Sequence, residues 1–510
     1  MGNRPRLCFH RRMSAGQTEP PAAEPRIPRA WLLGAGLVAL AGVLARWRAA
    51  QGELWLDEIW SVHLAMEAET PLGVFTRLHH DNNHHLNTLW FMLLGDGHRS
   101  LLHRIPALLA SLGAVALVAR GPIPGGAAAR PLAVVAFSWS WFLVHYGSEG
   151  RGYALLMLFA LAAYQALERL LATGRRKWAV AFAVAGLLAL LSHLTFAFVL
   201  AGLYAWAGLA LLRGRGQAPA ASALRSPATL ALLALPGAGL VAIWAVDVRH
   251  LLIGGGPDYA VLEVLRELGR TAFAVPEGPA VLLLIALVAA MVFEVAAMAR
   301  AREPQWAFWA VALVLAPAVL LTVRRPVFLA ARYFSFAVPF VLLLVSAFLA
   351  RCVRSGRIGR VAVALLTLSF VVASTGPIAR LMVDGRGHYR EAIAFLAANT
   401  AGPVISVGGD NDFRDSTVLH YYENAAAPKE VDYVTAGHWT ATAPCWLLRH
   451  QAALGVRSPQ ALSGVNGRMY VLAGVFPYAG VSGWAWEVYR LAEGDSTPVA
   501  AAVVSETATP

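Results

Sequence analysis

The most constraining feature of the sequence is a series of long apolar segments that carry almost no charge. A helix needs about 20 mostly apolar residues to cross a bilayer, where every backbone polar group must be satisfied within the helix itself. Segments of this kind lie near residues 31–47, 101–119, 131–146, 153–172, 178–193, 195–212, 228–247, 279–299, 305–323, 333–350 and 360–379. They predict an all-α polytopic membrane protein with about eleven transmembrane helices. The apolar segment Leu86–Leu94 is too short to span and predicts an interfacial or re-entrant helix.

Composition supports the membrane class. The chain has 510 residues, of which 58% are apolar and 14% charged, whereas soluble domains carry roughly a quarter charged residues. The formal net charge of +12 comes mostly from arginines in short loops, without the basic tracts of a nucleic-acid binder. Cys8, Cys352 and Cys445 are far apart and form no C-x-x-C pair, so neither a disulfide framework nor a cysteine zinc site is expected. We therefore expect contact with membrane lipids and none with nucleic acid.

The positions of the basic residues predict the topology. A cytoplasmic N-terminus places most basic loops inside, which is the usual bias: Arg4 to Arg29, Arg120 and Arg130, Arg175 to Lys177, Arg213 and Arg215, Arg300 and Arg302, and Arg351 to Arg360. Residues 1–30 then form a disordered cytoplasmic tail. Residues 48–100, 147–152, 248–278 and everything after about 380 lie on the outer face of the inner membrane. A signal peptide is disfavoured, because no small-residue cleavage site follows Trp31–Ala45.

The sequence changes character after residue 385. Strand-like runs at Pro403–Val407, Val431–Val434 and Arg468–Ala473 alternate with helix-like stretches at Tyr389–Ala398 and Ser416–Glu423. This alternation is typical of an α/β domain with a partly parallel sheet. We predict a transmembrane domain over 31–380, with an outer loop at 48–100, and a small extracytoplasmic α/β domain over 385–510.

Two adjacent carboxylates, Asp57 and Glu58, lie within the apolar stretch Leu54–Trp60. If this stretch is a helix, one face carries an apolar stripe of Trp55, Ile59, Val62 and Met66. Asp57 lies on the opposite face. We interpret this as a helix that lies in the headgroup region with its tryptophans toward the lipid and a carboxylate held at the membrane surface. The alternative is that Asp57 only solvates the helix or stabilises its first turn.

A dense polar patch follows at His79–Asn87 and leads into the short apolar helix. Its histidines and aspartate have the chemistry to hold a divalent metal or to donate hydrogen bonds to phosphate. The alternative is a hydrophilic interfacial loop. The patch lacks a familiar ligand spacing, so we assign no metal-binding residue and leave a divalent metal as an open cofactor.

Two further outer segments carry ionisable residues close to the membrane. Glu149 and Arg151 lie in a very short loop between apolar segments, where charges are costly and often functional; the alternative is a structural ion pair between the two. The segment Arg324–Tyr333 includes Arg332 and precedes a predicted helix. A guanidinium group suits an anionic ligand such as phosphate. The alternative is nonspecific anchoring to headgroups.

These features, in this order, resemble the membrane-embedded glycosyltransferases of the GT-C type, and among them the protein O-mannosyltransferase and lipid A aminoarabinose transferase group. That group has an acidic pair in the first outer loop, present here as Asp57-Glu58. Its histidine-proline-proline-leucine stretch corresponds to Asn83–Asn87, which keeps the histidine and lacks the prolines.

Three further elements carry the resemblance, which covers about residues 31–380. The R-x-P start of the second helix is present as Arg104–Pro106. The family element R-E-A-R-P-Y corresponds to Ser148–Tyr153, in which the first arginine and the proline are replaced. The late R-Y pair corresponds to Arg332-Tyr333.

The resemblance implies an inverting glycosyltransferase that moves a sugar from a polyprenyl-phosphate donor to a hydroxyl or amine of a lipid, glycan or protein acceptor. It implies that Asp57 is the general base and that Glu58 orients Asp57 or the donor sugar. It also implies a set of donor- and phosphate-binding residues: His84, His85, Glu149, Arg151, Tyr153, Arg332 and Tyr333.

Two other functions compete with this interpretation. A transporter or flippase of lipid-linked glycans would place ionisable residues inside its helices near the bilayer midplane, whereas here they lie in loops. A noncatalytic anchoring protein would explain the outer domain. It would give no reason for Asp57, Glu149 and Arg332 to gather on one side.

Overall fold

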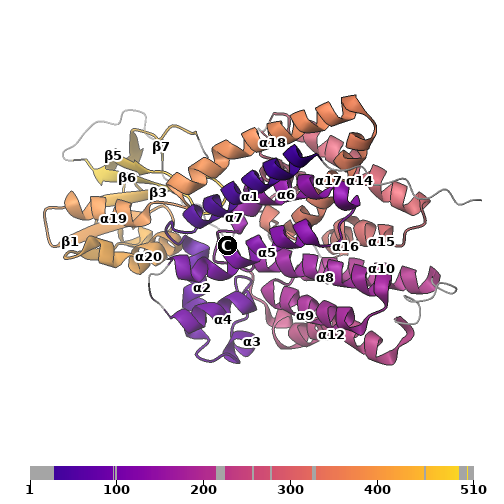
Figure 1. The fold of residues 1–510 in the computed structure, drawn as a ribbon. Coiled ribbons are helices and arrows are strands. Elements are labelled where there is room, and N and C mark those ends of the chain that lie inside the picture. Colours follow the sequence, from indigo (N-terminus) through magenta and orange to yellow (C-terminus); the bar gives the residue numbers. More distant parts are fainter. Residues whose placement is uncertain are drawn as a thin grey trace, which may run out of the picture.

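The computed structural model describes residues 28–95, 97, 100–213, 224–254, 258–275, 278–323, 329–452, 455–492 and 502–503. Of the predicted tail at 1–30, only residues 28–30 are described. Residues 324–328, at the start of the Arg324–Tyr333 segment, also lie outside the described residues. Figure 1 shows a bundle of long helices with a mixed α/β region at one end. The chain is thus a helical multi-pass membrane protein with a C-terminal α/β domain.

Apolar sequence explains the long helices. In the described part of the chain, nine helices are long and apolar enough to cross a membrane. The helices of the bundle are α1 (Arg29–Ala49), α5 (Ser100–Arg120), α6 (Arg130–Trp139), α7 (Trp141–Tyr146), α8 (Tyr153–Thr173), α9 (Arg176–Ser192), α10 (Phe196–Arg213), α12 (Pro227–Val246), α14 (Ala280–Arg300), α15 (Trp306–Ala310), α16 (Ala316–Val323), α17 (Ala337–Arg354) and α18 (Arg357–Asp384). A π-helical turn, Val311–Leu315, joins α15 to α16.

Two predicted spans are not among the nine long helices of the described chain. The segment predicted at 131–146 breaks at Ser140, whose backbone is extended (φ −61°, ψ 124°), so that α6 and α7 are separate. The Ser140 hydroxyl donates to the carbonyl of Ala272 at 2.8 Å. The segment predicted at 178–193 is the 17-residue helix α9.

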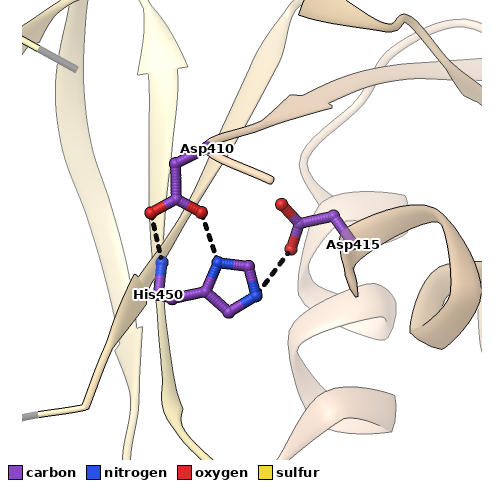
Figure 2. Close-up of side chains that lie close together, drawn as sticks. All are labelled: Asp410, Asp415 and His450. Atoms are coloured by element: carbon purple, nitrogen blue, oxygen red, sulfur yellow. Dashed lines mark hydrogen bonds and ion pairs between the residues drawn. The ribbon is translucent and has the colours of Figure 1, made fainter. Parts of the chain in front are cut away.

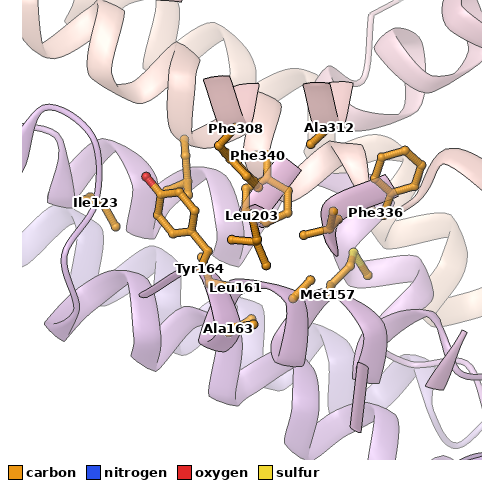
Figure 3. Close-up of a cluster of buried hydrophobic side chains, with 14 of the residues drawn as sticks. Ile123, Met157, Leu161, Ala163, Tyr164, Leu203, Phe308, Ala312, Phe336 and Phe340 are labelled. Carbon is orange, nitrogen blue, oxygen red and sulfur yellow. The ribbon is translucent and has the colours of Figure 1, made fainter. Parts of the chain in front are cut away.

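Aromatic side chains fill the centre of the bundle. Tyr164 on α8 lies with its ring centroid 5.0 Å from that of Phe308, and Phe308 lies 5.0 Å from Phe340 on α17. Figure 3 shows these rings meeting Leu161 and Leu203 between the helices. These aromatic and aliphatic contacts hold α8, α10, α15 and α17 together.

Short helices lie at the end of the bundle that faces the α/β region. They are α2 (Leu56–Glu67), α3 (Gly73–Thr76), α4 (His85–Leu94), η2 (Val248–His250), α13 (Val261–Phe273) and η4 (Ala331–Phe334). The predicted short helix at Leu86–Leu94 is therefore confirmed as α4. All these elements come from loops predicted to share one face of the membrane, and their contacts place them at one end of the bundle.

The α/β region contains a seven-stranded sheet in the order β2-β1-β3-β6-β5-β4-β7. Its elements are α19 (Tyr389–Ala398), β1 (Val404–Gly409), α20 (Asp412–Tyr421), η5 (Glu423–Ala426), β2 (Glu430–Tyr433), η6 (Ala436–His438), β3 (Trp446–Gln451), β4 (Ala461–Ser463), β5 (Met469–Phe476), β6 (Ala485–Leu491) and β7 (Ala502–Val503). Strand β1 is parallel to β2 and β3, with Val407 opposite both Tyr433 and Trp446, whereas β3, β6, β5 and β4 pair antiparallel. The predicted partly parallel sheet is confirmed.

The interpretation of the α2 stripe as lipid-facing is wrong, because protein covers most of it. Trp55, Ile59 and Val62 are buried in one apolar cluster with residues of α19, α20 and the sheet. Only Met66, at the end of the stripe, is exposed. On the same helix, the Trp60 ring lies 5.2 Å from that of Phe413 on α20. The tryptophans around the acidic pair thus attach α2 to the α/β domain.

Candidate active site at the end of the bundle

Asp57 lies in the first turn of α2, and its side chain is 18% exposed. Its Oδ2 atom contacts the guanidinium groups of Arg151 and Arg332, the latter at 3.2 Å. Its backbone carbonyl accepts hydrogen bonds from Ser61 at 2.8 Å and from the Asn82 amide at 3.0 Å. In the described part of the chain, no hydrogen bond engages Oδ1 of Asp57. One carboxylate oxygen is therefore held by cations and the other is available to a substrate.

Arg151 comes from the short loop between α7 and α8 and is buried. It contacts Asp57 and donates to Oδ1 of Asn82 at 2.5 Å, and its guanidinium carbon lies 5.2 Å from the centre of the Tyr153 ring. Burial opposes the charged form, but Tyr153 and Asp57 outweigh it and raise the pKa of Arg151. Arg151 therefore remains a cation inside the protein.

Arg332 comes from η4, and its side chain is 30% exposed. Burial opposes its charge, yet the nearby carboxylate of Asp57 raises the pKa of Arg332 well above its usual range. The side chain also lies over the Tyr333 ring, 5.8 Å from its centre. Two guanidinium groups thus share one carboxylate, and the group has an excess of positive charge that suits an anion.

His84 and Tyr153 lie beside this charged group and retain unused hydrogen-bonding atoms. His84 Nδ1 accepts a hydrogen bond from the Gly152 N–H at 2.7 Å, which assigns the ring proton to Nε2. Burial and the charge of Arg151 hold the pKa of His84 well below its usual range, so the ring is a neutral donor. In the described part of the chain, neither His84 Nε2 nor the Tyr153 hydroxyl has a partner. Buried donors without acceptors point to a ligand.

Gly152 permits the close approach of this loop to its neighbours. A Cβ atom at this position would lie 2.0 Å from the backbone oxygen of Ser192 and 3.0 Å from the side chain of His84. The His84 ring is also 4.8 Å from that of His193, at the end of α9. The helices α8 and α9 thereby fix His84 against Arg151.

Glu58 lies next to Asp57 in sequence but in a different environment. It is fully buried, and Arg104 on α5 binds both of its oxygens, at 2.8 and 2.6 Å. The Gly150 N–H donates to the same carboxylate at 2.6 Å. Burial raises the pKa of Glu58, but Arg104 outweighs burial and lowers it below the usual value. Glu58 therefore ties α2 to α5 and to the loop that carries Arg151.

Glu149 has contacts that differ from those expected of a donor-binding residue. It is fully buried and accepts from the hydroxyl of Ser482 at 2.8 Å and from Arg386 Nε at 3.3 Å. Burial raises its pKa, but the hydrogen bond with His145 and the charge of Arg386 outweigh burial and lower it. Glu149 thus pairs with Arg386, and Arg151 with Asp57, which also corrects the alternative of an ion pair between Glu149 and Arg151.

His85 also has an unexpected partner. Its Nε2 atom contacts Asp247 at the end of α12 at 3.0 Å, and His79 contacts the second oxygen of Asp247 at 2.9 Å. The His85 ring is stacked on Phe75 with centroids 5.0 Å apart. The two adjacent histidines therefore separate, with His84 beside Arg151 and His85 holding the polar loop to α12.

Sequence reasoning gave no role to Asn82, Asp247 or Arg386, and it recognised Arg104 only as part of the R-x-P start of the second helix. Asn82 contacts both Asp57 and Arg151, and it lies within the polar patch at His79–Asn87. The polar composition of the patch indicated that this region matters, but it did not distinguish Asn82 from its neighbours. Arg386 lies at the start of the α/β domain, where an isolated arginine carries no pattern.

A cavity of about 530 Å³ adjoins this group. It lies between α7, α13, η4 and the 478–483 loop of the α/β domain, and its lining includes Tyr146, Glu263, Arg266, Arg332, Tyr333 and Ser482. Arg332 thus faces both Asp57 and a volume large enough for part of a substrate.

Comparison with known proteins supports the fold. No protein-family model matches the sequence, and no curated protein matches it in sequence. Among solved structures, the apo ArnT of Cupriavidus metallidurans matches with a TM-score of 0.50 and 14% identity, over 90% of this chain and 98% of that chain. The oligosaccharyltransferase AglB of Archaeoglobus fulgidus, solved with an inhibitory peptide and a dolichol-phosphate, gives 0.47 and 11% identity, over 82% and 69%. The match with ArnT confirms the expected resemblance to GT-C enzymes at the level of the fold.

Proposed function

We propose that this chain, which has the fold of the GT-C type membrane glycosyltransferases, is an inverting glycosyltransferase that uses a polyprenyl-phosphate sugar. The observation that carries the proposal is the Asp57 carboxylate held between Arg151 and Arg332 beside a cavity. A base and two cations in contact are what a displacement with a phosphate leaving group requires.

Asp57 acts as the general base. The acceptor oxygen attacks the anomeric carbon of the sugar, and its proton passes to Oδ1 of Asp57. The bond between the anomeric carbon and the phosphate oxygen breaks, and the lipid phosphate leaves with the electron pair. Because attack occurs opposite the leaving group, the anomeric configuration inverts. The partial exposure of Asp57 supports this role, since an acceptor hydroxyl can approach it.

Arg151 and Arg332 bind the phosphate of the donor. Both now contact Oδ2 of Asp57, and an arriving phosphate competes for the same guanidinium groups. His84 Nε2 and the Tyr153 hydroxyl supply two further donors, and Tyr333 stacks with Arg332 at the cavity wall. The charge that develops on the departing phosphate is thereby stabilised.

Glu58, Glu149 and His85 position the site without touching the substrate. Glu58 holds the loop of Arg151 through Gly150, and Glu149 holds the same loop to Arg386 of the α/β domain. His85 holds the polar loop through Asp247. All three are buried, so their removal acts through the geometry of Asp57, Arg151 and His84.

The layout in the membrane follows from the same proposal. The transmembrane domain extends over residues 31–380, and the α/β domain over 385–510 lies outside the cytoplasm with the site beneath it. The arginine-rich loops on the opposite side support this orientation. Labelling of a cysteine introduced at exposed Glu69 from outside the cell tests it; protection of that position until the cells are opened would contradict the orientation.

The direct test is incubation of the purified full chain with a panel of polyprenyl-phosphate sugars and acceptors, with release of lipid phosphate as the readout. We expect release with wild type and release at least about 100-fold slower with Asp57→Asn. The matched control is Glu69→Gln, which removes an exposed carboxylate in the same loop. Equal release by wild type and Asp57→Asn would refute the role of Asp57. Movement of an intact lipid-linked glycan across proteoliposomes without release would favour the transporter instead.

A further inference from the structure

The sheet carries a second cluster of ionisable side chains that the proposed glycosyl transfer does not use. Asp410 follows β1, Asp415 lies on α20, and His450 lies near the end of β3, as Figure 2 shows. One potential ligand atom from each residue lies within 4.8 Å of the other two. Carboxylate oxygens and an imidazole nitrogen together are a donor set for Zn²⁺ and similar ions.

The position of the cluster in the sheet is one at which α/β folds bind ligands. Strand β1 lies between β2 and β3 in the sheet. The chain leaves β1 toward β2 on one side, and it leaves β3 toward β4 on the opposite side. Adjacent parallel strands whose connections diverge leave a crevice at their carboxyl ends. Asp410 and His450 lie at the carboxyl ends of these two strands, β1 and β3.

The composition of the cluster suits a cation. Two carboxylates face one imidazole; Asp415 is fully buried, and the His450 side chain is only 9% exposed. The guanidinium of Arg414 lies over the Trp484 ring, 5.9 Å from its centre. Buried carboxylates that lack a compensating charge are costly. A divalent cation would neutralise both while the imidazole stays neutral.

The Nε2 atom of His450 lies beside Asp415 but makes no hydrogen bond in the described part of the chain. The Nδ1 atom of the same ring contacts Asp410. The nearest acceptor to Nε2 is Oδ1 of Asp415 at 3.3 Å. Two ligands that are each about 2.0 Å from a tetrahedral Zn²⁺ are separated by about 3.3 Å.

The surrounding groups hold the three side chains in place. The Trp486 indole N–H donates to Asp415 at 3.2 Å, and the His450 N–H donates to Asp410 at 3.0 Å. A Cβ atom at Gly409 would lie 1.9 Å from Oδ2 of Asp415, so only glycine allows Asp415 to reach the strand end. Such outer contacts orient metal ligands in proteins. Asp410 is 19% exposed and leaves a route from solvent.

We infer that His450 Nε2 and Asp415 bind a divalent transition-metal ion, tested here with Zn²⁺, while Asp410 orients the imidazole through Nδ1. The site holds β1, β3 and α20 together at the carboxyl ends of the two strands. Ala452, two residues after His450, lines the cavity beside Arg332, so the ion also stabilises the wall of that cavity. This inference stands on the sheet alone and does not depend on the glycosyl transfer.

The test measures Zn²⁺ bound to the full-length protein in detergent, after treatment with a chelator and dialysis against micromolar Zn²⁺. We expect one ion per chain, with binding at least tenfold weaker in His450→Gln and in Asp415→Asn. The matched control is His420→Gln, which breaks an exposed histidine–carboxylate pair on the same helix α20 and should bind as wild type does. A second control, His79→Gln, removes a histidine of the separate polar patch.

Three results would overturn the inference: wild type binds no Zn²⁺, His450→Gln and Asp415→Asn bind it as wild type does, or binding is lost in His79→Gln and kept in His450→Gln. If the circular dichroism spectrum shows that either cluster variant has not folded, wild type is titrated with Co²⁺ instead, and this titration decides whether the site exists. Visible absorption bands that saturate at one equivalent and vanish on addition of Zn²⁺ support the site. An unchanged spectrum contradicts it.

Discussion

The two charged clusters of this protein are opposite in composition. Around Asp57, one carboxylate is shared by two guanidinium groups, whereas around His450 two carboxylates share one imidazole. The first cluster has more cations than carboxylates and lies at the end of a helical bundle, and the second has more carboxylates than imidazoles and lies at the carboxyl ends of β1 and β3. The sign of the imbalance indicates the sign of the ligand, an anionic phosphate in one case and a metal cation in the other.

The largest effect is expected for Asp57→Asn, because it removes the base while preserving the shape of the side chain. We predict that kcat falls by roughly 10² to 10⁴-fold, the range for loss of a general base. Binding of Zn²⁺ should be unchanged, since Asp57 belongs to the other cluster. The measurement is the rate of lipid-phosphate release at saturating donor. A fall of less than tenfold would remove Asp57 from the reaction.

The next effect is expected for Glu58→Gln, which leaves Arg104 without its charged partner inside the protein. Removal of one partner of a buried ion pair costs about 3–5 kcal/mol, measurable as a loss of thermal stability in detergent. The pKa of Glu58 is lowered in the folded chain. Its stabilising contribution is therefore complete above the unfolded-state pKa, about 4.3, and is lost as pH falls through the folded-state pKa. Stability below about pH 4 should thus fall less steeply in the variant than in wild type.

A cross-test with two ligands separates the clusters directly. A ligand at 100 times its Kd stabilises a folded protein by about 2.7 kcal/mol. We predict that undecaprenyl phosphate raises the melting temperature of wild type but not of Arg332→Gln, and that Zn²⁺ raises both equally. In Asp415→Asn, undecaprenyl phosphate should still raise the melting temperature, whereas Zn²⁺ should not. Loss of both responses in one variant would show that the two clusters act as a single site.

The smallest effect is expected for Arg77→Gln, which breaks the exposed pair of Arg77 with Glu69. Exposed ion pairs contribute about 0.2–1 kcal/mol. Activity, Zn²⁺ binding and the response to undecaprenyl phosphate should stay within twofold of wild type. A large change would mean that charge anywhere in this loop matters, which would weaken the distinction between buried and exposed pairs on which the comparison rests.

Part of the candidate site was predicted from the free-energy cost of placing charged residues near the membrane. Charges that interrupt or border apolar segments are expensive, and this singled out Asp57, Arg151 and Arg332, which the structure brings together. The same reasoning grouped Glu149 with Arg151, and the family resemblance grouped His84 with His85, whereas the structure separates both pairs. Neighbours in sequence point in different directions once a turn or a helix begins between them.

The sequence by itself determined the helices, the short helix α4 and the mixed α/β tail, because hydrophobic length and periodicity are local properties. Only the tertiary structure decided which charges meet. Asp57 and Arg151 are 94 residues apart, and Glu149 and Arg386 are 237 residues apart. The cluster of Asp410, Asp415 and His450 depends on β3 lying beside β1. Such contacts follow from the way whole helices and strands pack, and no short stretch of sequence records that packing.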